Sequence, residues 1–447
     1  MRVAVIGAGI VGVTTAYELA ADGHEVAVFE HRGSVAAETS FANAGVVAPG
    51  YVTPWAAPGM PAKVLRYLFS RHAPVRLRPT LNPATLGWLW QWWRACRFET
   101  WQANRTQMQA LAFYSRQRLH ELTRTLKLEY ERGDGYLVLL REPKDVALAK
   151  PGLALLTELN MRFHLVDAAH CRQIEPGLNA ETPLHAGIHL PDDEVGNCRQ
   201  FAHLLRTEAQ KLGAHFRFHT TVQRIVPGAQ PQLVHAYAPP AESTQFQHGP
   251  QTPADDPPTE PLPFEPATEA FDAIVVCAAM GAPALLRPLG LKLPLQAVHG
   301  YSITAPLREH RTHPDHGPRS GLMDERYKVA ISRLGARIRV AGSAEIGGTL
   351  LEPHGNALDT LYKVLHDWFP GSASLAQAQR WKGARPMLPD GPPVIGRCGL
   401  DGVWLNLGHG SSGWALACGS ARVLADQLAA RSPALDTRGL NIERLQH

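Results

Sequence analysis

The chain has 447 residues, 45% of them hydrophobic and 19% charged, so it is globular and long enough for two domains. Its formal net charge of +4 is too small to indicate nucleic-acid binding, and its six scattered cysteines lack a CxxC pair, which argues against a zinc site or a disulfide framework. No segment approaches the roughly 18 apolar residues of a membrane-spanning helix, and Met1 leads straight into a predicted strand instead of a signal peptide. We therefore expect a cytoplasmic protein that binds neither nucleic acid nor metal.

The first thirty residues have the pattern of a dinucleotide-binding fold. Residues 2–6 predict a buried strand, and a G-x-G-x-x-G motif follows, before apolar residues at helical spacing. Such glycines allow a tight turn and close approach of a pyrophosphate, which the helix N-terminus attracts. A second predicted strand, residues 25–30, ends in an acid that suits ribose hydroxyls and would repel a 2′-phosphate. The predicted nucleotide-binding residues are Gly7, Gly9, Ile10, Val11, Gly12, Glu30 and His31, and they do not separate NAD from FAD.

The next segment is basic and rich in tryptophan. No Asp or Glu occurs from Thr39 to Phe98, whereas "PAKVLRYLFSRH" is short, basic and amphipathic, and "LGWLWQWWRACRFETW" follows it. Cations beside tryptophans suit the surface of an anionic bilayer, so residues 60–101 are a candidate for peripheral membrane contact on the inner face of the bacterial inner membrane. The alternative is that the tryptophans fill a domain core and the arginines are merely solvated.

The remaining predicted elements return to the nucleotide-binding pattern. A helix is expected over 197–212, a strand over 215–226, and a flexible proline-rich insertion over 227–268 at the tip of a hairpin. A buried strand over 271–281 comes next. Near the C-terminus a strand over 402–408 precedes "GHGSSG" and a helix over 413–430. The serines of this turn have no G-x-S-x-G context, so they do not indicate a nucleophile. Because strand, glycine turn and helix recur at both ends of the chain, the pattern favours a flavoprotein over a nicotinamide enzyme.

Seven stretches in the right order resemble the superfamily of D-amino acid oxidase and glycine oxidase, and within it the bacterial D-amino acid dehydrogenases (small subunit). They are "VIGAGIVGVTTAYELAADGHEV", "ETSFANAGVVAPGYVTPWAAPGMP", "LPDDEVGNC", "HGYSIT", "DERYKVAISRLGARIRVAG", "GARPMLPDGPPVIGR" and "LNLGHGSSGWALACGS". The resemblance implies an α/β fold with a discontinuous Rossmann-like, glutathione-reductase-like FAD-binding domain (residues 1–50, 197–290 and 383–447). It also implies an α+β substrate domain with an antiparallel sheet (residues 51–196 and 291–382).

The resemblance also implies the site. An arginine within "GARPM" needs a partner, which is either a substrate carboxylate or an internal salt bridge. The family context favours the carboxylate for Arg385 and adds Tyr327, which could instead simply pack on the sheet. Further cofactor contacts are implied for Thr39, Ser40, Asn43, Ala44, Gly45, Val222, Ala278, Gly281, Gly408, Gly410, Ser411, Ser412 and Gly413. Weaker candidates for the pocket are Tyr51, His299, Tyr301 and His409.

The implied activity is oxidative deamination of D-amino acids to 2-oxo acids and ammonia, by hydride transfer from Cα to N5 of FAD. Electrons would pass to a respiratory acceptor such as quinone. Residues 410–413 lack the second arginine of glycine oxidases, and residues 383–396 lack a cysteine, so we expect non-covalent FAD. The alternatives are an oxidase that uses oxygen (of the D-amino acid or glycine/sarcosine type), a non-catalytic flavin-binding redox sensor and an NAD-dependent dehydrogenase. The D configuration of the substrate rests on the resemblance alone.

Overall fold

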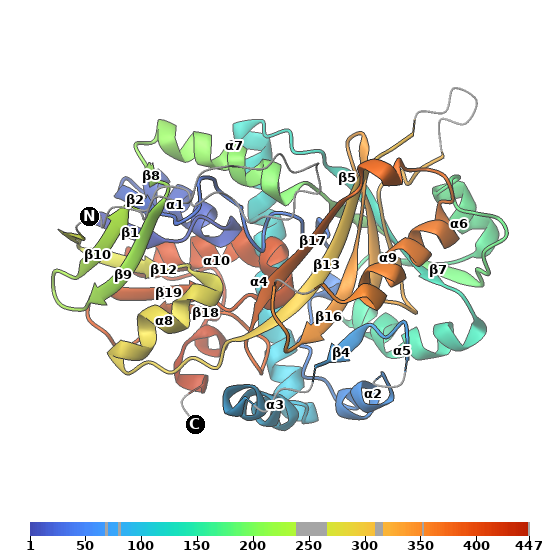
Figure 1. The fold of residues 1–447 in the computed structure, drawn as a ribbon, viewed down its shortest axis with the longest axis horizontal. Coiled ribbons are helices and arrows are strands. Elements are labelled where there is room, and N and C mark those ends of the chain that lie inside the picture. Colours follow the sequence, from blue (N-terminus) through green and yellow to red (C-terminus); the bar gives the residue numbers. More distant parts are fainter. Residues whose placement is uncertain (68–69, 79–81, 238–265, 309–315, 351–352, 446–447) are drawn as a thin grey trace, which may run out of the picture.

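A computed structural model describes residues 1–67, 70–78, 82–237, 266–308, 316–350 and 353–445 (Figure 1). In Figure 1 the layers that contain both glycine turns occupy one half of the molecule, and a large, strongly twisted sheet occupies the other. The fold class expected from the sequence is confirmed by the arrangement of these layers.

The first sheet has the strand order β18–β19–β12–β1–β2–β8 and is parallel except where β18 pairs with β19. One face packs against helices α1, α7 and α10, because the inward apolar residues of both layers form a single core. The other face packs against α8 and a small three-stranded sheet. The bounds are β1 Arg2–Ile6, β2 Glu25–Phe29, β8 His215–Arg217, β12 Ala273–Val276, β18 Val394–Arg397, β19 Val403–Leu407, α1 Ile10–Ala21, α7 Cys198–Lys211, α8 Ala282–Leu286 and α10 Gly413–Leu428.

The predicted strand over 215–226 is two strands in two different sheets. β8 ends at Arg217, and β9 (Thr220–Val226) begins the antiparallel three-stranded sheet with β10 (Gln232–Tyr237) and β11 (Ala267–Ala270). His219 between them has a φ of +53°, a left-handed turn that carries the chain from one sheet to the other. The expected proline-rich insertion is therefore too wide, since β10 and the start of β11 lie within it. Residues 238–265 lie outside the described residues.

The second sheet has the order β17–β13–β16–β15–β14–β5–β7–β3, with β4 beside β16 and β6 beside β7. Its pairs are antiparallel, as expected, except β14–β5 and β16–β4. Helix α9 packs against one face and α5 against the opposite face. The bounds are β3 Val46–Val47, β4 Val75–Leu77, β5 Gly133–Leu140, β6 His164–Asp167, β7 Ala186–Val195, β13 Gln296–Pro306, β14 Gly321–Asp324, β15 Val329–Leu334, β16 Arg337–Ile346, β17 Gln379–Met387, α5 Pro143–Glu158, α6 Ala168–Ile174 and α9 Gly355–Trp368.

Two expected domain borders differ from the structure. The long helix α4 (Phe98–Leu126) falls within the range expected for the substrate domain, but its apolar side chains belong to the core of the nucleotide-binding layers. The reason is that α10 is buried on nearly all sides and needs a helix to cover it, and Arg118 of α4 adds a two-pronged ion pair to the buried Glu18 of α1. In addition, the border expected at residue 383 falls inside β17.

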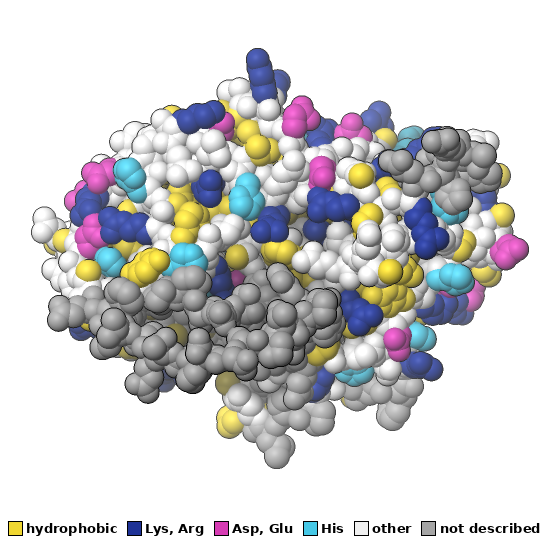
Figure 2. All heavy atoms as spheres, turned by 45° about the horizontal axis from the view of Figure 1, so that its top comes forward, with side chains coloured by type: hydrophobic (Ala, Val, Ile, Leu, Met, Phe, Trp, Pro, Cys, Tyr) yellow, Lys and Arg dark blue, Asp and Glu magenta, His cyan; other side chains and the backbone are white. Residues whose placement is uncertain are grey.

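The basic side chains are dispersed on the face shown in Figure 2. In the part of this face that is not grey, Lys and Arg alternate with acidic, polar and apolar side chains. This face does not have the dense basic stripe that typically tracks a nucleic-acid backbone. Helices α2 (Met60–Tyr67) and α3 (Pro83–Ala95) lie at the lower edge in Figure 1. Helix α2 contacts β4, and α3 shares an apolar cluster with β4.

Candidate active site

The first glycine turn has the geometry that close approach of a pyrophosphate needs. Gly7 has a φ of +100°, and a Cβ at Gly12 would lie 1.8 Å from the carbonyl oxygen of Gly7, so both positions require glycine. A Cβ at Gly9 would meet only the Ser40 hydroxyl, at 3.6 Å, so the space above the turn is open. That hydroxyl accepts a hydrogen bond from the backbone N–H of Ile10 (3.1 Å), at the N-terminus of α1. The turn fits a dinucleotide phosphate.

The acid after β2 is held at the same turn. The Glu30 carboxylate accepts hydrogen bonds from the backbone N–H of Ala8 (2.7 Å) and of Arg32 (2.8 Å). His31 lies between Glu30 (3.1 Å) and Glu38 (3.0 Å), and these two carboxylates raise the pKa of His31 to about 9. An acidic side chain beside the glycine turn is what recognition of an adenosine ribose requires.

Residues 39–45 connect the two halves of the molecule. The Thr39 hydroxyl donates to the carbonyl of Ala384 in β17 (2.7 Å), and the side chain of Asn43 accepts from the N–H of Gly45 (2.9 Å). The indole of Trp414 in α10 donates to the Gly45 carbonyl (3.2 Å). These bonds hold the turn between α10 and the large sheet.

The second glycine turn precedes α10. Gly408 and Gly410 have φ of +82° and +58°, and a short 3₁₀ turn over Gly410–Ser412 leads into the helix. The side chain of Ser412 makes no capping bond, so N–H groups at the start of α10 are available to a ligand. His409 points elsewhere: its Nε2 lies 2.9 Å from the Ser420 hydroxyl, and burial lowers the pKa of His409 to about 3. His409 is therefore a neutral core residue and not part of the pocket wall.

A cleft of about 580 Å³ lies between the two glycine turns and the large sheet. Twelve residues predicted from the sequence line it, and they come from both ends of the chain and from both sheets. They are Ile10, Thr39, Ser40, Asn43, Ala44, Tyr51, Tyr301, Arg385, Gly410, Ser411, Ser412 and Gly413. Because these residues are spread over 400 positions of sequence, their convergence supports the site that the motifs predicted.

Among the described residues, Arg385 has no acidic partner although it lies in the cleft wall; Lys63 lines the cleft too, but its side chain is exposed to solvent. Its Nη1 donates to the backbone carbonyls of Ser343 (2.9 Å) and His299 (3.4 Å), and desolvation lowers its pKa to about 10, so it stays charged at neutral pH. A Cβ at Gly300 would lie 2.3 Å from Nη2, so the missing side chain of Gly300 makes room for the guanidinium. The predicted internal salt bridge is not formed, which leaves Arg385 available to an anionic ligand.

Tyr327 is not brought to the cleft. The strand expected over 325–333 begins only at Val329, and Tyr327 lies in the preceding turn, where its N–H donates to Asp324 (3.1 Å). Its ring packs against the guanidinium of Arg141 (5.1 Å) and the ammonium of Lys363 (5.4 Å). The structure therefore does not place Tyr327 in the cleft lining, and the packing alternative describes its surroundings.

Of the weaker pocket candidates, Tyr51 and Tyr301 line the cleft, whereas His299 and His409 do not. Tyr51 lines the cleft with its ring edge-on to Tyr136 (6.4 Å), and burial raises its pKa. Tyr301 also lines the cleft, but its hydroxyl donates to the buried Glu345 and accepts from the N–H of His354 (3.0 Å). His299 is buried beside the Gly347 carbonyl (3.2 Å) and does not line the cleft.

Val222, Ala278 and Gly281, three further predicted cofactor contacts, also lie outside the cleft lining, around the first sheet. Val222 is in β9 and packs with Ala278 against the core beneath that sheet, and Gly281 closes the short turn after β12 through its N–H to Ala278 (2.7 Å). Their place is compatible with the adenosine half of a dinucleotide, and their contact with it stays a prediction.

Several lining residues were missed from the sequence. Trp55, Lys63 and Tyr67 come from α2 and the loop before it, Tyr136 from β5, and Ser343 from β16. The sequence around Lys63 indicates only a candidate for membrane contact. No local signal distinguishes Tyr136 or Ser343 from other strand residues, since both depend on how distant strands pair.

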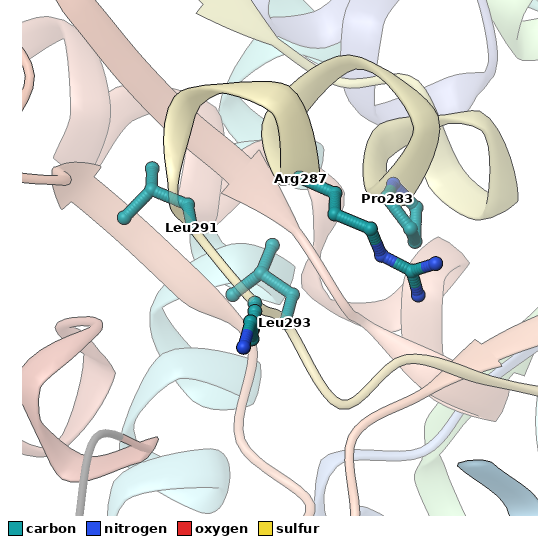
Figure 3. A pocket seen from close by; sticks show the side chains of 5 residues that line it. Pro283, Arg287, Leu291 and Leu293 are labelled. Carbon is teal, nitrogen blue, oxygen red and sulfur yellow. The ribbon is translucent and has the colours of Figure 1, made fainter.

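A second hollow, of about 390 Å³, lies after β12 and is lined by Pro283, Arg287, Leu291, Lys292 and Leu293. Figure 3 shows Arg287 extending toward Pro283, with Leu291 and Leu293 on the other side. Arg287 and Lys292 are exposed, and none of the predicted site residues lines this hollow. We therefore place the chemistry in the larger cleft.

A family model described as FAD dependent oxidoreductase (DAO) matches residues 2–427. The chain belongs to this family of FAD-dependent oxidoreductases. This confirms the resemblance drawn from the motifs and FAD as the cofactor, and it sets aside the NAD-dependent alternative. The glycine turns and the open α10 N-terminus fit FAD.

Relatives of similar length share about two fifths of the residues. A "D-amino acid dehydrogenase" of Cereibacter sphaeroides is 42% identical over 99% of this chain and 95% of its own length. Another protein of that name, from Rhizorhabdus wittichii, is 41% identical over 99% of this chain and 100% of its own length. Among solved structures, glycine oxidase from Geobacillus kaustophilus has a TM-score of 0.69 and 18% identity over 99% of this chain and 98% of its own. L-proline dehydrogenase from P. horikoshii has a TM-score of 0.68 and 16% identity, and the match covers 100% of this chain and 97% of that chain. These structures share the fold.

Proposed function

We propose that this FAD-dependent oxidoreductase is a D-amino acid dehydrogenase that converts D-amino acids to 2-oxo acids and ammonia. The observation that carries the proposal is Arg385, a cation in the cleft wall whose Nη2 and Nε have no protein acceptor among the described residues. A guanidinium binds a carboxylate in a two-pronged manner, and every amino acid has one. The relatives named D-amino acid dehydrogenase support the class and the handedness of the substrate.

The residues of the cleft act by orientation. Arg385 would hold the carboxylate so that the Cα–H bond faces the cofactor, and bound FAD would supply the two-electron oxidation. The described lining residues include no Asp, Glu or His, so the cleft offers no conventional carboxylate or imidazole base. The substrate must then arrive with a neutral amine, which favours activity above neutral pH.

The test is anaerobic mixing of the holoenzyme with a panel of D- and L-amino acids while the flavin absorbance is followed. We expect rapid bleaching with D-amino acids alone. Arg385→Ala should keep FAD but lose kcat/KM by roughly two to four powers of ten, because removing one partner of a buried charge pair costs about 3–5 kcal/mol. Bleaching by L-amino acids alone, or unchanged kcat/KM in Arg385→Ala, would overturn the proposal.

We further propose that a membrane quinone, rather than oxygen, accepts the electrons, and that α2 and α3 contact an anionic bilayer. In α3, Trp88 is buried, but Trp90 and Trp93 are 55% and 58% exposed. Arg94 lies over the ring of Trp90 (4.7 Å). The tryptophans therefore divide between the core and the surface, and the exposed pair has the amphipathic chemistry of an interfacial anchor.

The position of α2 supports the same proposal. Met60, Lys63 and Tyr67 line the cleft, whereas Leu65 of the same helix is 62% exposed. A lipid-soluble acceptor could thus reach the cleft beside the proposed membrane face. No helix in the described part of the chain is long and apolar enough to span a bilayer.

Sedimentation with anionic and neutral vesicles at low salt tests the membrane contact. The holoenzyme should bind anionic vesicles, and Trp90→Ser/Trp93→Ser should bind them more weakly. Leu148→Ser, which changes a 73% exposed leucine on α5, is the matched control and should bind like the wild type. Protein that stays in the supernatant would contradict the contact, and oxygen uptake as fast as quinone reduction would favour the oxidase alternative.

A further inference from the structure

A β-bulge lies directly beside Arg385. Between the pairs His299↔Glu345 and Tyr301↔Gly342, strand β13 has one residue, Gly300, whereas β16 has two. A bulge of this kind bends a strand and redirects a side chain, and such bulges are frequent at active sites. The two residues of the bulge, Ser343 and Ala344, both line the cleft.

The backbone of Ser343 is in an unfavourable conformation. Its φ is +58°, in the left-handed region that glycine adopts readily and other residues adopt at a cost. A glycine at this position would form the same bulge without that cost. A serine that is held in a strained conformation at the wall of a cleft therefore points to a use for its hydroxyl.

That hydroxyl is buried and has no hydrogen-bond partner among the described residues. Ser343 is 6% exposed, and its Oγ is inaccessible to solvent. An unpaired buried hydroxyl is costly, so most such groups find a partner. The carbonyl of the same residue accepts a hydrogen bond from Nη1 of Arg385 (2.9 Å). The hydroxyl therefore belongs to a residue that is in direct contact with the guanidinium.

We propose that Ser343 is a second ligand of the substrate carboxylate and that its hydroxyl donates to one carboxylate oxygen while Arg385 holds the other. The inference rests on the proposed function. Ser343 would take the role of a second carboxylate ligand. Tyr327 does not line the cleft, and residues 410–413 contain no cation that could take this role. Rotation about the single χ1 bond of serine lets Oγ turn toward the bound anion.

The two tyrosine hydroxyls that the large sheet contributes to the cleft wall are less suited to this role. The Tyr301 hydroxyl is already engaged by Glu345 and the His354 N–H. The Tyr136 hydroxyl is buried and unpaired, but no contact joins it to Arg385. Of these three hydroxyl residues, Ser343 is the one whose backbone carbonyl accepts a hydrogen bond from the guanidinium.

The test compares carboxylate binding in holoenzyme variants. Acetate and its neutral analogue acetamide are titrated while the flavin absorbance is followed, and KM is measured with D-alanine. Ser343→Ala and Ser343→Gly should weaken acetate binding about tenfold to a hundredfold, the range for a hydrogen bond to a charged group. Acetamide binding should change less, so the preference for acetate over acetamide falls. Ser343→Gly also relieves the backbone strain, so it separates loss of the hydroxyl from loss of folding.

Ser302→Ala is the matched control. Ser302 lies on the neighbouring strand β13, is 1% exposed and also has an unpaired hydroxyl, but it does not line the cleft. Its loss should leave the acetate preference unchanged. Wild-type acetate affinity in Ser343→Gly, an equal loss for acetate and acetamide, or loss of FAD from both Ser343 variants would overturn the inference. Acetate binding needs no turnover, so this result is independent of whether D-amino acids reduce the flavin.

Discussion

The substitution Gly300→Ala tests how the active-site arginine is placed. A Cβ at this position would lie 2.3 Å from Nη2, 2.4 Å from Cζ and 2.7 Å from Nη1 of Arg385. The backbone of Gly300 has no positive φ, so alanine introduces no strain of its own. The atoms in conflict belong to the end of a flexible side chain, so we expect the guanidinium to move and the fold to persist.

The expected effect follows from the size of that movement. Restoring an ordinary contact of 3.4 Å requires the guanidinium to shift by about 1 Å. A misplacement of about 1 Å in a residue that orients the substrate costs on the order of 10²-fold in rate. We therefore expect Gly300→Ala to lower kcat/KM for D-alanine about a hundredfold, with unchanged FAD content and a Tm within a few degrees of the wild type.

The assay is steady-state reduction of a dye acceptor, together with flavin absorbance and thermal unfolding. Gly187→Ala is the control. Gly187 lies in β7 and outside the cleft lining, but a Cβ there would meet the Cys171 sulfur at a similarly short 2.5 Å. It should lower Tm and leave kcat/KM per bound FAD unchanged. If Gly300→Ala kept kcat/KM within about threefold of the wild type, the guanidinium could not be held as the structure describes.

Three further predictions follow from single contacts. Gly12→Ala should abolish FAD binding, measured by flavin content, because the new Cβ would meet the Gly7 carbonyl at 1.8 Å; a yellow, active variant would contradict the tight turn. Tyr327→Phe should keep kcat/KM near the wild-type value, since its hydroxyl lies outside the cleft lining, and a tenfold loss would return Tyr327 to the site. The pKa of His409 is lowered to about 3 in the folded protein, so below its usual value of about 6.5 the unfolded state binds the additional proton and stability falls as pH falls. In denaturant unfolding between pH 4 and 7, His409→Asn should remove up to about 1.4 kcal/mol per pH unit of that slope, and an unchanged slope would show that His409 is not buried neutral.

Much of the nucleotide-binding half could be predicted from the sequence, because its signals are local. The spacing of Gly7 and Gly12 reflects contacts within one turn, and the expected helix over 197–212 is found as α7, with the Asn197 side chain accepting from the Gln200 N–H (3.2 Å). Arg385 could be proposed because a charge in an apolar, turn-rich stretch needs a partner wherever the chain places it. The family and the cofactor followed from the order of such local motifs.

The substrate side was decided by tertiary structure. The start of β15 at Val329 removes Tyr327 from the cleft, and no local pattern marks that boundary. Gly300, Ser343 and Arg385 come together only because β16 and β17 both pair with β13, and the left-handed φ of Ser343 exists only within the bulge that this pairing creates. Contacts between strands 40 to 85 residues apart depend on sheet register, which a single sequence does not encode in any short segment. The sequence alone thus determined the cofactor and the arginine, whereas the fold decided which hydroxyl stands beside that arginine.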